Sequence, residues 1–238
     1  MTIRALFFDA GDTILHKWAT SKRDRWAWLC RQAGISLPTD PEQVLAGARA
    51  NERFFQDRLQ HEDRFQPAWY IRMNRAGLAA MGLPGDLDEM AAGVHAVATQ
   101  HADLDEWGLV DPEAEPLLAE LRSRGYRLAV VSNWDGRLVD RMRPTGLSGY
   151  FDAMLDSAVV RSIKPDPRIF QIACAATGVL PEEALHVGDS PGADVAGALA
   201  AGVHPVLLDS LDLFSQGFRD LPPFPTIQRL SQLLDLLE

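Results

Sequence analysis

Four short motifs in this sequence place chemically reactive side chains where strands are expected to end. Asp9, Ser132 and Asp189 each end or follow a short apolar run, and Lys164 lies in a loop that leads into a helix. In an open parallel sheet, ligands bind outside the carboxyl ends of the strands. We therefore expect these four side chains to converge on one crevice.

The carboxylates of this set predict a divalent cation. Asp9, Asp189 and Asp194, brought together, would repel one another and raise their pKa values unless a cation joined them. Oxygen ligands alone suit Mg²⁺, which prefers carboxylates, waters and substrate phosphate. Ser132 and Lys164 would then supply a hydrogen bond and a positive charge to a phosphate group. The predicted cofactor is Mg²⁺, and the predicted chemistry is phosphoryl transfer to Asp9.

Each motif also has a plain structural interpretation. A lone aspartate at a strand end, such as Asp9, is as often a turn former or a helix cap. Lys-Pro-Asp-Pro from residue 164 would be a loop entering a helix, and Gly-Asp-Ser-Pro from residue 188 an ordinary turn. The functional interpretation depends on finding all of them, in this order, at strand ends.

The elements around the motifs predict an α/β fold, with a Rossmann-like doubly wound parallel sheet as the core. After Asp111, apolar strand-like runs alternate with helical patterns, which implies a parallel sheet with helices on both faces. Strands are expected at 3–8, 127–131, 153–155, 184–187 and 203–208, and the tail predicts an apolar helix at 230–237.

A different pattern occupies residues 17–101, where helix follows helix and no convincing strand occurs. This stretch is expected to be an inserted helical cap domain. The remaining segments, residues 1–16 and 102–238, are expected to form the catalytic core.

Composition and charge argue against some classes of binding partner. The chain has 238 residues and a net charge of -10, which argues against a nucleic-acid partner. No run approaches about 18 apolar residues, so no membrane partner is expected. The two cysteines lie in helix-like stretches and read as buried hydrophobic residues. The apolar start is too short for a signal segment, and we expect a cytoplasmic location. The sequence carries no signal of oligomeric state.

Together the motifs resemble those of the haloacid dehalogenase superfamily, over nearly the whole chain. Asp9-Ala10-Gly11-Asp12-Thr13 resembles its nucleophile loop, and the insert resembles its small helical cap. The other three matching motifs are Val130-Val131-Ser132-Asn133, Lys164-Pro165, and Val187-Gly188-Asp189-Ser190 through Asp194. Residues 132–138 and 164–170 are similar to one branch of the superfamily whose substrates are poorly assigned.

The resemblance implies a role for each matching residue. Asp9 would be the nucleophile and a metal ligand, Gly11 a metal ligand through its carbonyl, and Asp189 a metal ligand. Asp194 would be a ligand or an anchor beside the ligands. Ser132 and Lys164 would act in catalysis and, with the neighbouring Asn133 and Trp134, bind a small phosphorylated substrate.

One position departs from the superfamily pattern. Its phosphatases usually carry a second aspartate two residues after the nucleophile, to protonate the leaving group, and here that residue is Gly11. Loss of a general acid costs about 10² to 10⁴ in rate. Asp12 is the candidate substitute, but neighbours in an extended segment point to opposite sides, so a turn-forming role is favoured.

Two alternatives remain open. Dehalogenation of a 2-haloacid uses an aspartate nucleophile and needs no leaving-group acid, so Gly11 permits it. A low-activity pseudo-enzyme that binds a phosphorylated ligand or a protein is the other alternative. His186, inside an expected strand, is expected to be a core residue.

Overall fold

The structure, a computed structural model, divides the chain into two compact units. Met1–Thr20 and Trp107–Glu238 form the first unit, and Ser21–Glu106 form the second. The structure describes residues 2–17, 21–58, 66–101, 108–214, 217–218 and 221–237. The expected boundary between residues 101 and 102 borders residues outside this described part.

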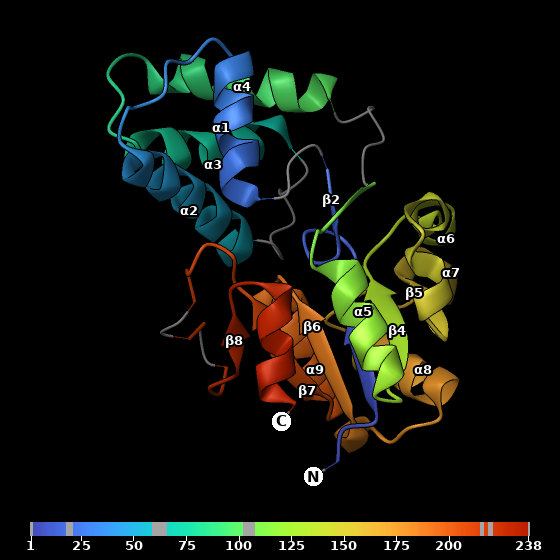
Figure 1. Ribbon diagram of the computed structural model, residues 1–238. Helices are drawn as coiled ribbons and strands as arrows, with labels where there is room; N and C mark the ends of the chain where they lie inside the picture. Colours follow the sequence, from blue (N-terminus) through green and yellow to red (C-terminus); the bar gives the residue numbers. More distant parts are fainter. Residues whose placement is uncertain are drawn as a thin grey trace. The chain divides into compact units, whose positions relative to one another are not determined.

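Six parallel strands form the sheet of the first unit, in the order β5-β4-β1-β6-β7-β8 (Figure 1). Phe8 pairs with Val130 of β4 and with Val187 of β6, so the residues that follow these three strands meet at one edge. The strand order reverses between β1 and β6, which is where ligands bind in such sheets. The strands are β1 (Ala5–Phe8), β4 (Arg127–Ser132), β5 (Ala153–Asp156), β6 (Ala184–Gly188), β7 (His204–Leu208) and β8 (Thr226–Ile227).

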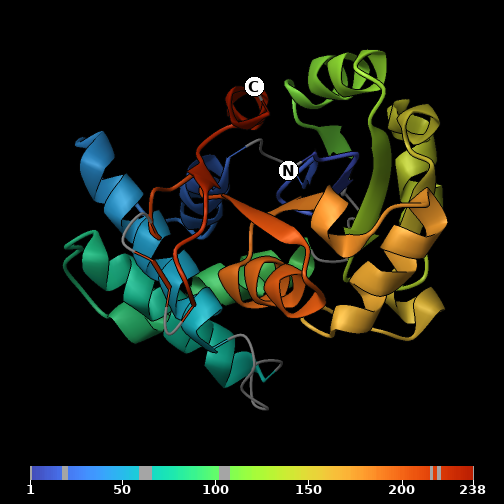
Figure 2. The ribbon, with the colours of Figure 1, turned by 90° about the horizontal axis from the view of Figure 1, so that it is seen from below.

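Helices cover both faces of this sheet (Figure 2). Successive residues of a strand point to opposite faces, so Leu6 and Phe8 pack in one buried cluster and Ala5 and Phe7 in another. The first cluster includes α5 (Ala114–Ser123), α6 (Leu138–Met142) and the 3-10 helix Leu230–Leu236. The second includes α8 (Pro167–Thr177) and α9 (Ala196–Ala201). The predicted α/β core is therefore confirmed.

Some short elements differ from the sequence prediction. β2 (Leu15–His16) and β3 (Leu109–Val110) form an antiparallel pair that was not expected, because two residues are too few to show alternation. The expected apolar tail helix is a 3-10 helix. The remaining short elements are α7 (Ser157–Val160), a π-helix (Pro191–Val195), and 3-10 helices at Arg143–Thr145, Leu147–Tyr150 and Pro181–Glu183.

In its described residues the second unit contains helices joined by loops and turns, and no strand. Its buried residues include the aromatic Trp69, which lies against Phe54 and Phe55 edge to face. Its helices are α1 (Lys22–Gln32), α2 (Pro41–Arg58), α3 (Pro67–Ala80) and α4 (Leu87–Gln100). No helix in the described ranges has the length and apolar character needed to cross a membrane. The role of this unit as a cap stays a prediction.

Candidate active site

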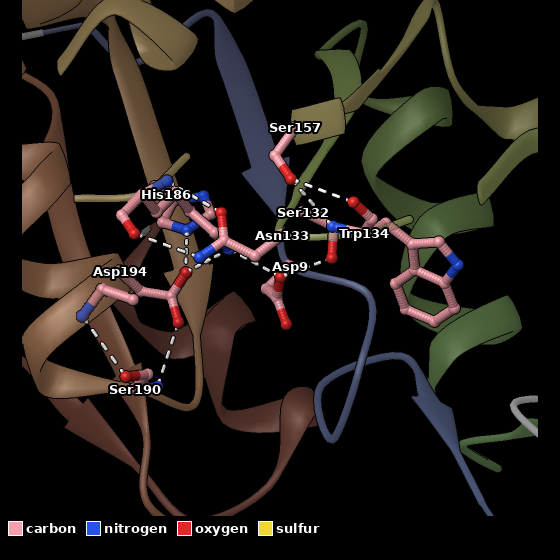
Figure 3. Close-up of polar contacts among 10 residues, drawn as sticks. Asp9, Ser132, Asn133, Trp134, Ser157, His186, Ser190 and Asp194 are labelled. Carbon is pink, nitrogen blue, oxygen red and sulfur yellow. Dashed lines mark hydrogen bonds and ion pairs between the residues drawn. The ribbon is translucent and has the colours of Figure 1, made fainter. Parts of the chain in front are cut away.

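Asp9 follows β1, the strand at the middle of the sheet. Its backbone N–H donates to the Val187 carbonyl at 2.8 Å, which extends the ladder to β6 by one residue. The residue is only 7% exposed. Ser132 Oγ donates to Asp9 Oδ1 at 2.8 Å (Figure 3). Lys164 Nζ donates to the same oxygen at 2.6 Å. Among the described residues, Oδ2 of Asp9 has no hydrogen-bond partner, so it keeps its lone pairs for attack or for metal binding.

Lys164 reaches Asp9 because Asn133 fixes the loop that carries it. The Lys164 backbone N–H donates to Asn133 Oδ1 at 2.7 Å, and Asn133 Nδ2 donates to the Lys164 carbonyl at 3.1 Å. This reciprocal pair joins the end of β4 to a loop that lies 31 positions further along the chain. Asn133 therefore positions Lys164 through its backbone, and its own contact with substrate stays a prediction.

Asp194, in the π-helix after β6, is buried, and its carboxylate accepts hydrogen bonds from three donors. Its Oδ1 accepts from Lys164 Nζ at 2.6 Å and from His186 Nε2 at 2.8 Å. Its Oδ2 accepts from the Ser190 backbone N–H at 3.0 Å. Gly188 makes room for this carboxylate, because a Cβ at that position would lie 2.5 Å from Asp194 Oδ2. A side chain at residue 188 would therefore displace Asp194.

Three carboxylates gather at this edge of the sheet. Asp9, Asp189 and Asp194 each offer an oxygen, and these oxygens lie within 4.8 Å of one another. Lys164 supplies one positive charge against their three negative charges. An all-oxygen set with excess negative charge fits a hard divalent cation such as Mg²⁺.

Burial and the neighbouring charges shift the pKa values of three buried residues, Asp9, Lys164 and Asp194. Burial, together with the negative charge of Asp194, raises the pKa of Asp9 despite the attraction of Lys164. Burial opposes the charge of Lys164, yet Asp194 and Asp9 outweigh it and raise the Lys164 pKa. Burial likewise opposes the charge of Asp194, but Lys164 and His186 lower its pKa. Lys164 is thus a cation and Asp194 an anion at neutral pH, and a divalent cation would help to keep Asp9 ionised.

Trp134 is the predicted site residue that the structure does not bring to the carboxylate cluster. Its backbone is fixed by Ser157, whose Oγ accepts from the Trp134 N–H at 3.0 Å and donates to the Trp134 carbonyl at 3.1 Å. The half-buried indole packs against the core and points away from Asp9 in Figure 3. Contact between Trp134 and a substrate stays a prediction.

The loop that follows Asp9 differs from an extended segment at Asp12. The φ angle there is 56°, a left-handed conformation, so the expected alternation of side chains does not apply. Asp12 Oδ1 lies 3.8 Å from His16 Nδ1, and His16 Nε2 lies 3.0 Å from Asp111 Oδ2. Burial opposes a positive charge on His16, but Asp111 and Asp12 raise its pKa to about 9. The metal-binding role of the Gly11 carbonyl and an acid role for Asp12 stay predictions.

His186 is the residue that the sequence reasoning assigned to the core alone. It is fully buried, as expected, and Phe170 packs edge to face against its ring. Its Nε2, however, contacts the carboxylate of Asp194. The sequence could have indicated this contact, because a polar ring in a buried strand, two residues before Gly188, needs a hydrogen-bond partner.

Comparisons with known proteins agree with this geometry. The sequence profile of the haloacid dehalogenase-like hydrolases matches residues 3–202. Haloacid dehalogenase-like hydrolase domain-containing protein 3 from Homo sapiens is 33% identical, with 100% of this chain and 96% of the relative aligned. The protein of the same name from Mus musculus is 43% identical over 129 residues, which is 52% of this chain and 51% of the relative.

Two further similarities involve phosphatases. Glyceraldehyde 3-phosphate phosphatase from Methanopyrus kandleri is 33% identical over 99% of this chain and 97% of its own. The crystal structure of a phosphatase of this superfamily from Thermococcus onnurineus has a TM-score of 0.57 and 26% identity, and covers 99% of this chain and 98% of its own. Solved 2-haloacid dehalogenases share the fold as well, so the fold does not distinguish between the two chemistries.

Proposed function

The chain belongs to the family of haloacid dehalogenase-like hydrolases, and from that membership we propose that it is a Mg²⁺-dependent phosphatase with Asp9 as nucleophile. The observation that carries the proposal is the surrounding of Asp9. Ser132 and Lys164 both bind its Oδ1, and its carboxylate belongs to a cluster of three. Such a site combines a nucleophile, phosphate-binding donors and an oxygen-rich cation site.

The residues divide the reaction between them. An oxygen of Asp9 attacks phosphorus while the bond to the leaving group breaks, which gives an aspartyl-phosphate. Water then attacks this phosphorus, releases phosphate and restores the Asp9 carboxylate. Lys164 and Ser132 stabilise the negative charge on the phosphoryl oxygens. Asp9 and Asp189 would hold Mg²⁺, with Asp194 beside or among the ligands, and the bound ion would neutralise charge on the phosphate.

Gly11 limits the range of substrates. It has no side chain to protonate a leaving oxygen, so an alkyl phosphate must leave without an acid from that position. An acyl or aryl phosphate has a weakly basic leaving group and depends less on protonation. We propose a small phosphorylated metabolite as substrate, in line with the name of the Methanopyrus kandleri relative. A cytoplasmic location and the absence of a nucleic-acid partner stay predictions.

The two alternatives are weaker on the same observations. Dehalogenation needs no metal, and three clustered carboxylates without a divalent cation would disfavour an ionised nucleophile at Asp9. A binding role without turnover gives no use to Asp9, a residue whose main use is attack, although Gly11 is compatible with such a role.

The test is phosphate release by the purified chain. Wild type and an Asp9→Asn variant are compared on p-nitrophenyl phosphate, acetyl phosphate and a panel of sugar phosphates, with Mg²⁺ and with EDTA. We expect phosphate release to require both Mg²⁺ and Asp9. Equal release by both proteins, or chloride release from 2-chloropropionate in EDTA, would contradict it.

A further inference from the structure

His186 lies in β6 with its ring completely buried. Its Nε2 is 2.8 Å from Asp194 Oδ1, the oxygen that also accepts from Lys164. Within the described ranges, its Nδ1 is buried and has no hydrogen-bond partner. Phe170 packs edge to face on the ring at 4.9 Å between centroids. The two nitrogens therefore differ, because Nε2 contacts a carboxylate and Nδ1 is buried without a hydrogen-bond partner among the described residues.

These surroundings select one form of the imidazole. A protonated ring would bury an unpaired N–H at Nδ1, which costs about 1 to 3 kcal/mol. A neutral ring with hydrogen on Nδ1 would leave Nε2 without a hydrogen to donate to the carboxylate of Asp194. The neutral form with hydrogen on Nε2 satisfies Asp194 and leaves only a bare lone pair at Nδ1. The contact with Asp194 therefore places a hydrogen on Nε2, and His186 donates through Nε2–H to Asp194.

The other hydrogen bonds to Asp194 show what the His186 donor adds. Lys164 is shared between Asp9 and Asp194, so it does not serve Asp194 alone. The Ser190 backbone N–H holds the other oxygen, Oδ2. Of the two side chains that donate to Asp194 Oδ1, Lys164 also contacts Asp9, whereas His186 contacts Asp194 alone.

We infer that His186 is a positioning residue for the cation site, which fixes the Asp194 carboxylate through Nε2–H and thereby sets the affinity for Mg²⁺. The inference rests on the proposed function for its choice of Mg²⁺. Loss of a partner that hydrogen-bonds a carboxylate of a metal site typically costs about 10- to 100-fold in metal affinity or activity. His186 would act through Asp194 and would not touch the substrate.

The test measures Mg²⁺ binding directly, by calorimetry on the full chain. His186→Phe keeps a ring against Phe170 and removes the donor, so we expect its dissociation constant for Mg²⁺ to rise by about 10- to 100-fold. His186→Gln replaces the ring by an amide that can donate from a similar position, and it should bind Mg²⁺ much as wild type does. Phe170→Leu is the matched control, because it weakens the packing and keeps the hydrogen bond.

The outcomes separate the inference from the proposed function. Equal Mg²⁺ affinity in His186→Phe and wild type overturns the inference, and so does an equal loss in Phe170→Leu or in His186→Gln. Circular dichroism and the midpoint of thermal unfolding check that the variants are folded. If wild type binds Mg²⁺ but releases no phosphate, the proposed function fails while the comparison among these variants still decides the role of His186. Absence of Mg²⁺ binding by wild type overturns both.

Discussion

Replacing Lys164 by Met tests whether this lysine holds the buried carboxylates together. Its Nζ lies 2.6 Å from Asp9 Oδ1 and 2.6 Å from Asp194 Oδ1, and its side chain is 2% exposed. At an effective dielectric constant of about 20, unit charges at that separation attract by about 6 kcal/mol. Desolvation offsets much of this attraction, and removal of one partner from a buried ion pair costs about 3 to 5 kcal/mol.

That loss should be visible in urea unfolding. With a slope of about 2 to 3 kcal/mol per M, Lys164→Met should lower the midpoint by about 1 to 2.5 M in EDTA. Mg²⁺ should narrow the difference between wild type and variant, because a divalent cation can neutralise the carboxylates that Lys164 leaves. Phosphate release should also fall, by about 10² to 10³, since one donor to the phosphoryl oxygens is lost.

Lys22→Met is the matched control. Lys22 pairs with Glu52 at 2.8 Å in the second unit, with side chains 10% and 13% exposed, so its loss should cost less, about 1 to 2 kcal/mol. Equal unfolding midpoints for the two variants in EDTA would show that the Asp9–Lys164–Asp194 contacts contribute no special stability. A loss in Lys164→Met that Mg²⁺ deepens would contradict the proposed cation site.

Three further predictions use other residues of the first unit. Gly11→Asp should speed alkyl phosphate cleavage by up to about 10² to 10⁴ and aryl phosphate cleavage much less, because it restores an acid for the leaving group; no change on alkyl phosphates would show that protonation is not limiting. Gly188→Ala should weaken Mg²⁺ binding in calorimetry, since its Cβ would displace Asp194, whereas Gly192→Ala, with no atom within 4 Å of the added Cβ, should not; equal affinities would contradict the crowding. His16 has a raised pKa of about 9 in the folded state, so its ion pairs stabilise the fold fully below its unfolded pKa of about 6.5 and progressively less as pH rises through 9. The difference in unfolding free energy between wild type and His16→Gln should shrink over that pH range, and a constant difference would show that no charge on His16 is involved.

The sequence by itself determined the strands that carry the site. Short apolar runs end at Asp9, Ser132 and Asp189, and the alternation of strands with helices requires a parallel sheet whose carboxyl ends meet at one edge. These are local properties, because burial of a strand or a helix face leaves its period in the sequence. The oxygen-rich cluster could therefore be predicted before any contact was known.

Only the tertiary structure decided which side chains of the site contact one another. Asn133 binds the backbone of Lys164, His186 donates to Asp194, and neither contact follows from spacing along the chain. The left-handed backbone at Asp12 likewise departs from the extended segment that the pattern implied. Such contacts join residues from different elements, and they depend on the packing of those elements, which leaves no periodic signal in the sequence.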